Sequence, residues 1–161
     1  MKCLFKIGLI LLLFCGSASA TELRNDAALA GLTETKVIFD INQGDPDLLL
    51  LRLKLIDKTY WQLLEFASTP KFILAFRGKA SRYVTADDSY IKPTELVQKK
   101  EIEELIVQLK KEGMVLEQCA LAANMQRIDI NDFLPQIDVV ANGYISMIGY
   151  QNKGYAFVPM D

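Results

Sequence analysis

The stretch KVIFDINQGDP, residues 36–46, contains the change from strand to helix that predicts the fold. Its apolar residues 37–39 are a short β-branched and aromatic run, typical of a buried strand. Residues 42–44, Asn-Gln-Gly, are turn formers, and Asp45 follows them as a helix N-cap. Pro46 suits the first helical position, where its missing N–H would have no partner in any case. The stretch therefore predicts a buried strand that passes through a turn directly into a helix.

Strand and helix patterns alternate along the rest of the chain. The second strand, KFILAF, covers residues 71–76, and the charged, turn-rich residues 79–98 predict a loop with at most one helical turn. Further strands are predicted at 114–118, 139–140 and 155–159, and helices at 46–66, 99–113, 120–126, 128–135 and 143–152. Such alternation favours a mostly parallel sheet with helices on both faces. We therefore predict an α/β fold, a three-layer sandwich around a five-stranded sheet. It forms one domain over residues 36–161, after a loose lead-in at residues 21–35.

Helix 46–66 carries more apolar residues than one buried face requires. In helix 46–66 they go more than halfway round: Leu48, Leu49, Leu50, Leu51, Leu53, Leu55 and Ile56. A second buried face would be either a subunit contact or a site covered by a loop of the same chain. Asn142 is expected to cap helix 143–152, in which the residues expected to face the core are Tyr144, Ile145, Met147 and Ile148.

The chain begins with the layout of a secretory signal peptide. Two lysines give a basic start, residues 9–14 are apolar, and a run of small residues ends in Ala-Ser-Ala. The predicted signal peptide is residues 1–20, and cleavage after Ala20 would give a periplasmic or secreted protein without a membrane anchor. One alternative is an uncleaved anchor. Another is lipid attachment at Cys15, which the bulky Phe14 before it disfavours.

Composition excludes several kinds of function. The chain has no histidine, which removes Ser-His-Asp catalysis, Cys-His pairs and imidazole metal sites, so no metal and no cofactor are predicted. Cleavage would lower the lysine and arginine count from 18 to 16 against 20 acidic residues, changing the net charge from −2 to −4. Such a mildly acidic domain offers no basic patch to nucleic acid. Cleavage would also leave Cys119 as the single cysteine, so no internal disulfide is predicted.

Cys119 stands at the carboxyl end of the third predicted strand. In open α/β sheets, reactive groups gather just beyond the carboxyl ends of the strands. If the first three strands are neighbours, Cys119 should meet Asn42 and Gly44 of the first strand end and Arg77 and Gly78 of the second. Glycines at these ends would permit close approach of the backbone.

Two features would stabilise a thiolate at Cys119. They are the N–H groups of the helical turn that follows it, and the guanidinium group of Arg77 or Arg127. A thiolate is the nucleophile of sulfur exchange and needs no histidine once it has formed. The alternative is a cysteine that only packs, because free cysteine is among the most buried residue types.

Several stretches, taken in order, resemble the DsrE/DsrF-like family, most closely its exported members. They are KVIFDINQGD, FRGKA, QCALAANMQRID and VVANGYISMIGYQNKGYAFVP, and they span nearly all of the chain after the leader. The most specific parts are Gly44 after the first strand, Cys119 followed by small residues, and the C-terminal VVANG and GYAFVP segments.

The resemblance implies a small α/β sandwich that assembles as a trimer or hexamer. Several intracellular members carry sulfur as a persulfide on the cysteine that Cys119 matches, in sulfur relay to tRNA modification or in sulfur oxidation. The implied function is an exported persulfide carrier, whose partners are a sulfur donor and an acceptor protein. The residues expected to bind the sulfur-bearing ligand are Asn42, Gly44, Arg77, Gly78 and Arg127.

The chain departs from the family pattern at two points. Relatives often have a histidine where Arg77 stands, and other members carry a second cysteine. These differences count against transferase activity, but they are compatible with a role in binding sulfur. The alternative function is a non-catalytic oligomeric binding or assembly module, in which Cys119 is a packed core residue.

Overall fold

The structure, a computed structural model, describes residues 23–66 and 68–160. The predicted signal peptide, residues 1–20 with its cleavage site, lies outside the described residues. Within them, no helix is both long and apolar enough to cross a membrane. The strands are β1 (Glu34–Ile41), β2 (Thr69–Phe76), β3 (Val115–Cys119), β4 (Asp138–Val140) and β5 (Ala156–Pro159). The α-helices are α1 (Asp26–Leu29), α2 (Pro46–Glu65), α3 (Leu96–Lys111), α4 (Ala120–Met125) and α5 (Gly143–Asn152). The 3₁₀-helices are η1 (Gly78–Val84), η2 (Asp88–Tyr90), η3 (Pro93–Glu95) and η4 (Ile130–Asp132).

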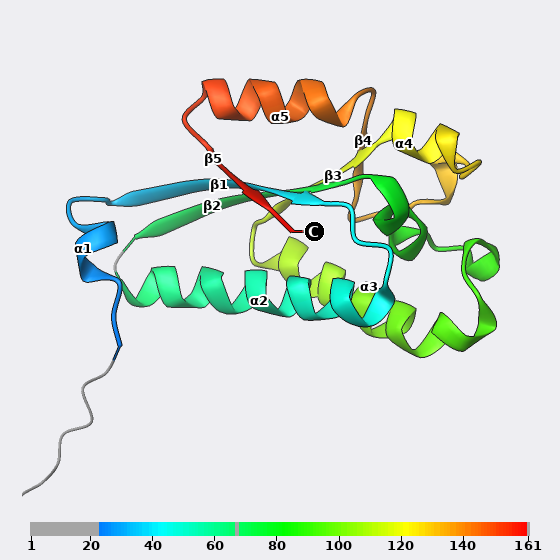
Figure 1. The fold of residues 1–161 in the computed structure, drawn as a ribbon, viewed down its shortest axis with the longest axis horizontal. Helices are drawn as coiled ribbons and strands as arrows, with labels where there is room; N and C mark the ends of the chain where they lie inside the picture. Colours follow the sequence, from blue (N-terminus) through cyan, green and yellow to red (C-terminus); the bar gives the residue numbers. More distant parts are fainter. Residues whose placement is uncertain (1–22, 67, 161) are drawn as a thin grey trace, which may run out of the picture.

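The five strands form one sheet in the order β4-β3-β2-β1-β5. Every neighbouring pair runs parallel, so the sheet is entirely parallel where the sequence predicted a mostly parallel one. Helices α2 and α3 cover one face of the sheet, and α5 lies on the other with α4 beside it (Figure 1). The predicted α/β fold with helices on both faces is confirmed. The carboxyl ends of β1, β2 and β3 lie side by side, as the site prediction requires.

Helix α2 begins as the sequence predicts. The Asp45 side chain accepts a hydrogen bond from the Leu48 N–H at 3.0 Å, and Pro46 occupies the first turn. Its buried residues, which pack on the sheet, are Leu49, Leu50, Leu53 and Ile56. Leu51 and Leu55 remain 50% and 42% exposed. Among the described residues, no segment fully covers these two leucines, so the subunit contact and cover by a loop both stay predictions for this face.

Strand β1 begins earlier than predicted, inside the expected loose lead-in. Residues 21–35 were expected to be irregular, but α1 lies among them and β1 starts at Glu34. The polar start of β1 is held by ion pairs, because the Glu34 carboxylate meets Lys36 on its own strand and Lys71 on β2. Cross-strand ion pairs leave no apolar pattern in the sequence, which hid this part of the strand.

The segment between β2 and α3 is also more regular than predicted. A loop was expected over residues 79–98, but η1, η2 and η3 occupy much of it and α3 already begins at Leu96. Ala80, Tyr83 and Val84 of η1 are buried in the main core. Three-residue turns of this kind satisfy their own backbone, so the segment needs no long apolar run to be ordered.

Helix α5 has the predicted boundaries, and Asn142 caps it by accepting a hydrogen bond from the Tyr144 N–H at 3.0 Å. The expected inward face is wrong in part. Met147 is buried against Ile38 and Ile73 of the sheet, as expected. Three residues expected to be buried are instead exposed by 58%, 67% and 59%: Tyr144, Ile145 and Ile148. The apolar residues of this helix are spread around its circumference, so the sequence could not indicate which side meets the sheet.

Candidate functional site

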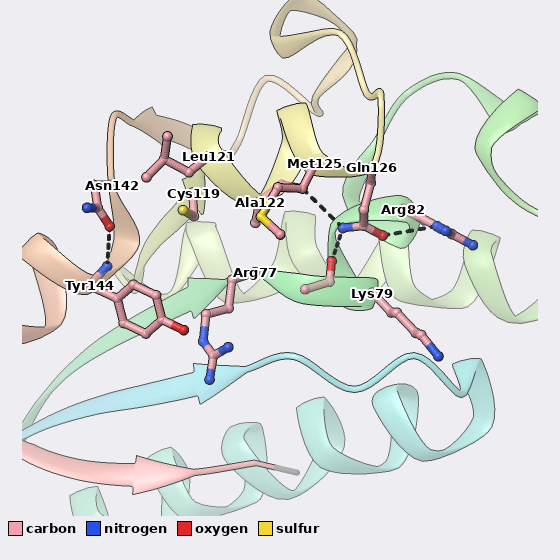
Figure 2. A pocket seen from close by; sticks show the side chains of 11 residues that line it. Arg77, Lys79, Arg82, Cys119, Leu121, Ala122, Met125, Gln126, Asn142 and Tyr144 are labelled. Carbon is pink, nitrogen blue, oxygen red and sulfur yellow. Dashed lines mark hydrogen bonds between the residues drawn. The ribbon is translucent and has the colours of Figure 1, made fainter.

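A cavity of about 420 Å³ opens beside the carboxyl ends of β2 and β3, bordered by α4, α5 and η1 (Figure 2). Its wall combines apolar and cationic side chains and contains no carboxylate. The lining residues are Arg77, Gly78, Lys79, Arg82, Cys119, Leu121, Ala122, Met125, Gln126, Asn142 and Tyr144. This composition favours an anionic ligand that also has an apolar part.

Cys119 is a buried residue of this wall. It is the last residue of β3 and the N-cap of α4, and it is 5% exposed while bordering the cavity. Space for its side chain comes from Gly143, the first residue of α5. A Cβ at Gly143 would lie 3.0 Å from the Cys119 Cβ and 3.5 Å from Sγ. The thiol therefore depends on a glycine that belongs to a different element.

Arg77 follows β2 and enters the cavity between the sheet and α5. Its Nε and Nη2 donate to the Asp40 carboxylate at 2.6 and 2.5 Å, a two-point contact with a side chain that is 6% exposed. The guanidinium carbon lies 5.4 Å from the centre of the Tyr144 ring. Asp40 therefore balances the charge of Arg77, and Arg77 in turn holds the aromatic wall of the cavity.

Two more cations reach the cavity from η1. Lys79 and Arg82 both line it, and no ion pair among the described residues involves either of them. Arg82 Nε donates to Gln126 Oε1 at 3.0 Å, and Gln126 Nε2 donates to the Gly78 carbonyl. The amide of Gln126 thus joins α4 to η1 across the cavity and gives Arg82 a neutral partner.

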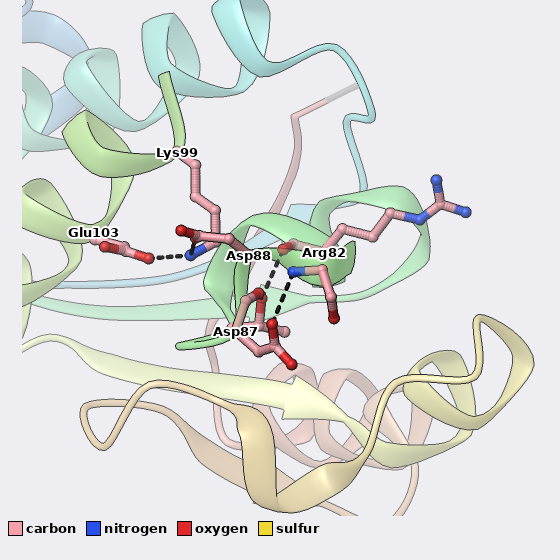
Figure 3. A network of polar contacts seen from close by, with 7 residues as sticks. Arg82, Asp87, Asp88, Lys99 and Glu103 are labelled. Atoms are coloured by element: carbon pink, nitrogen blue, oxygen red, sulfur yellow. Dashed lines mark hydrogen bonds and ion pairs between the residues drawn. The ribbon is translucent and has the colours of Figure 1, made fainter. Parts of the chain in front are cut away.

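A buried lysine fixes the segment that carries these cations (Figure 3). Lys99 of α3 is 1% exposed, and its ammonium group pairs with Asp88 at 2.8 Å and with Glu103. Burial acts to lower the pKa of Lys99, but the two carboxylates outweigh it and raise the pKa above its ordinary value. The Thr85 hydroxyl donates to the Arg82 carbonyl at 2.9 Å. Residues 82–88 are therefore tied to α3 and to themselves.

Some of the predicted site residues line the cavity and others stand behind it. Those in the wall are Cys119, Arg77 and Gly78. Asn42 does not line the cavity but packs against Gly78, which does: a Cβ at Gly78 would lie 3.3 Å from the Asn42 Cβ. Gly44 meets Lys79 closely, because a Cβ at Gly44 would lie 2.6 Å from the Lys79 Cβ. Gly44 therefore allows Lys79 to lie against the end of β1.

The prediction that Arg127 takes part in the pocket is wrong. Arg127 is exposed and does not line the cavity. It has a φ of 58°, and the Arg127 and Ile128 N–H groups donate to the Asn124 and Ala123 carbonyls. This is the Schellman arrangement that ends a helix, in which the left-handed residue turns the chain away. Gln126, one residue earlier, is the residue that faces the cavity.

Sequence reasoning missed several residues of the wall. The sequence predicts a loop for Lys79 and Arg82, and it indicates Asn142 only as a helix cap. Leu121, Met125 and Tyr144 carry no signal of their own, because exposed apolar residues of short helices resemble core residues in the sequence. Among the described residues, no group of three or more cysteine, aspartate or glutamate side chains could hold a metal ion.

Comparisons with known proteins place the fold and leave the activity open. No family model matches the chain. The chain is 36% identical, over 126 residues and 77% of its length, to an uncharacterised protein of Aquifex aeolicus (strain VF5), and it spans 55% of that protein. The structure is similar to a solved protein of unknown function from Methanobacterium thermoautotrophicum. That similarity has a TM-score of 0.58 and 19% identity, and it covers 78% of this chain and 98% of the other. At this identity the similarity concerns the α/β fold alone.

Proposed function

We propose that the chain is a member of the DsrE/DsrF-like family that carries sulfane sulfur as a persulfide on Cys119. The observation that supports this most directly is the position of the thiol. Cys119 borders a cavity at the carboxyl ends of the strands, together with Arg77, Lys79 and Arg82. Arg77, on the same side of the cavity as Cys119, suits a thiolate and the persulfide anion that it would become, and Lys79 and Arg82 add positive charge farther along the wall. The thiolate would take sulfur from a donor and yield it to an acceptor thiol by sulfur exchange.

The intact mass of the protein, before and after exposure to thiosulfate or polysulfide, tests this function. A gain of one sulfur atom, reversed by reductant and absent in Cys119→Ser, is expected. A gain that appears only after unfolding would contradict the proposal, because Cys119 would then be a core residue that the donor cannot reach.

The proposal also includes export of the chain. The leader pattern in residues 1–20 supports it, and the low exposure of Cys119, 5%, would limit oxidation of an unpaired thiol in an oxidising compartment. The mass of the protein recovered from the periplasm or medium is expected to correspond to a chain that begins at Thr21. A mass that retains residues 1–20 would favour the anchored alternative.

A second candidate function is a non-catalytic assembly module. The observation that favours it is the apolar surface of α2, where Leu51 and Leu55 are 50% and 42% exposed. Apolar side chains left in water on a regular helix are typical of a subunit contact. Light scattering is expected to give the mass of a trimer or hexamer, and Leu51→Glu with Leu55→Glu is expected to reduce it to a monomer. A monomeric wild-type protein would reject this function.

A further inference from the structure

The size of the cavity does not match a small inorganic sulfur anion. At about 420 Å³ it lies in the range of sites for organic molecules, roughly 300 to 1,000 Å³. A thiosulfate or hydrosulfide ion would occupy only a part of this volume. The remaining volume must be filled either by water or by the body of a larger ligand.

The wall beside Cys119 is apolar and open to solvent. Leu121 and Met125 of α4 are 50% and 86% exposed, and Tyr144 of α5 is 58% exposed, yet all three line the cavity. Binding of a ligand that covers such apolar surface is favourable, because the surface is removed from water. These residues therefore favour a ligand with a hydrocarbon or aromatic body over a fully hydrated ion.

The positive charges occupy two separate places along the cavity (Figure 2). Arg77 lies with Cys119 and Tyr144 on one side, where Asp40 balances its charge. Arg82 lies on the other side with Gln126, and Lys79 is also set apart from Cys119. An anionic group held by Lys79 and Arg82 would thus be separated from the sulfur that reacts at Cys119.

From this arrangement we infer that the cavity binds elongated organic dianions, and that the sulfur donor is one of them, such as an organic thiosulfonate with a carboxylate at its far end. The inference deepens the proposed function and rests on it for the transfer step. The apolar body would lie against Leu121 and Met125, and the carboxylate beside Lys79 and Arg82.

The transfer step needs no external oxidant. The Cys119 thiolate attacks the terminal sulfur of R–SO₂–S⁻, so a sulfur–sulfur bond forms at Sγ. The bond between this sulfur and the sulfonyl sulfur breaks, and its electron pair leaves with the sulfonyl group as the sulfinate R–SO₂⁻. The products are the Cys119 persulfide anion and a sulfinate. For a donor that also bears a carboxylate, each side of the equation carries three negative charges.

Three donors of increasing size test the donor class in single-turnover sulfur loading followed by intact mass. They are thiosulfate, benzenethiosulfonate and 4-carboxybenzenethiosulfonate, each corrected for its rate with free glutathione. Each step in the series is expected to raise the loading rate by about tenfold, which is the scale of discrimination by one pocket contact. Equal corrected rates for the three donors would overturn the inference.

Two double variants test which residues cause each of the two rate increases in the donor series. Leu121→Asn with Met125→Gln should abolish the gain from thiosulfate to benzenethiosulfonate, and Lys79→Met with Arg82→Met should abolish the gain from the added carboxylate. The matched control is Lys111→Met on α3, outside the cavity wall, which should leave all the rates unchanged. A loss of either gain in the control variant would contradict the assignment.

Binding of the unreactive 4-sulfobenzoate separates failure of this inference from failure of the proposed function. It is measured by NMR titration of the wild-type protein and of Cys119→Ser. Binding without any sulfur loading would overturn the carrier function and support the organic-anion site. Sulfur loading by thiosulfate without binding of 4-sulfobenzoate would support the carrier function and overturn the inference.

Discussion

Arg77 has two roles in the structure, because it pairs with the buried Asp40 carboxylate and lies over the Tyr144 ring. Arg77→Met would leave the Asp40 carboxylate, 6% exposed, without its two-point partner. An unpaired buried charge costs about 3 to 5 kcal/mol, so urea unfolding should show a loss of this size. The control is Arg82→Met, whose partner is the neutral Gln126 amide, and which should cost about 1 kcal/mol.

Removing the unpaired charge of the Asp40 carboxylate tests this explanation. The double variant Arg77→Met with Asp40→Asn should recover much of the lost stability, because an amide costs less to bury than a carboxylate. A double variant no more stable than Arg77→Met alone would show that Arg77 acts by packing against Tyr144 and not through Asp40.

Arg127 offers the opposite case, a residue whose replacement should stabilise the protein. Its φ of 58° is costly for a residue with a Cβ, and glycine is preferred at this position of a Schellman turn. Relief of the left-handed conformation, about 1 to 2 kcal/mol, exceeds the entropic cost of glycine, roughly 0.5 to 1 kcal/mol. Arg127→Gly should therefore raise the free energy of unfolding by about 0.5 to 1 kcal/mol. Sulfur loading should not change, since Arg127 lies outside the cavity; a loading rate lowered by this variant would return Arg127 to the site.

At the scale of elements, α5 meets β3 through Gly143 and Cys119. Gly143→Ala would place a Cβ 3.0 Å from the Cys119 Cβ, which forces α5 or the thiol to shift. Overpacking of this kind should cost about 1 to 3 kcal/mol and should slow the reaction of Cys119 with a thiol reagent.

Gly149 provides the matched control on the same helix. A Cβ at Gly149 would meet no atom within 4 Å, so Gly149→Ala should gain about 0.5 to 1 kcal/mol from helix propensity alone. Thermal unfolding and the thiol reaction rate are measured for both variants. Equal effects of the two substitutions would mean that the helix responds to alanine in general, and not to the contact with Cys119.

At the scale of the whole molecule, two tyrosines, one buried and one partly buried, limit stability at high pH. Burial and the nearby Glu95 carboxylate raise the pKa of Tyr83 to about 12. Burial and a hydrogen bond to Glu117 raise the pKa of Tyr150 as well. The unfolded chain releases these protons near pH 10, and the folded chain retains them to higher pH. The free energy of unfolding should therefore be unaffected by them below pH 10 and fall as the pH rises beyond it.

Urea unfolding at a series of pH values from 8 to 11 measures this fall, and Tyr150→Phe should make it shallower. Tyr144→Phe is the control, because Tyr144 is 58% exposed and should leave the slope unchanged. An identical slope in wild type and Tyr150→Phe would assign the alkaline loss to other groups.

Much of the fold could be predicted because local chemistry and periodicity agree along the chain. The Asp45 cap, the Pro46 start and the Asn142 cap each lie where the sequence placed them. The polar beginning of β1 and the 3₁₀ segment after β2 could not be predicted, because their order comes from cross-strand ion pairs and from burial among distant residues.

The sequence by itself determined the α/β order, the helix caps and the placement of Cys119 at a strand end, because these depend on neighbours in the chain. Only the tertiary structure decided which side chains surround the thiol. The order β3-β2-β1 brings Arg77 beside Cys119, and η1 adds Lys79 and Arg82. The left-handed turn at Arg127 removes the cation that the sequence proposed. These outcomes depend on contacts between segments far apart in sequence, which no local pattern records.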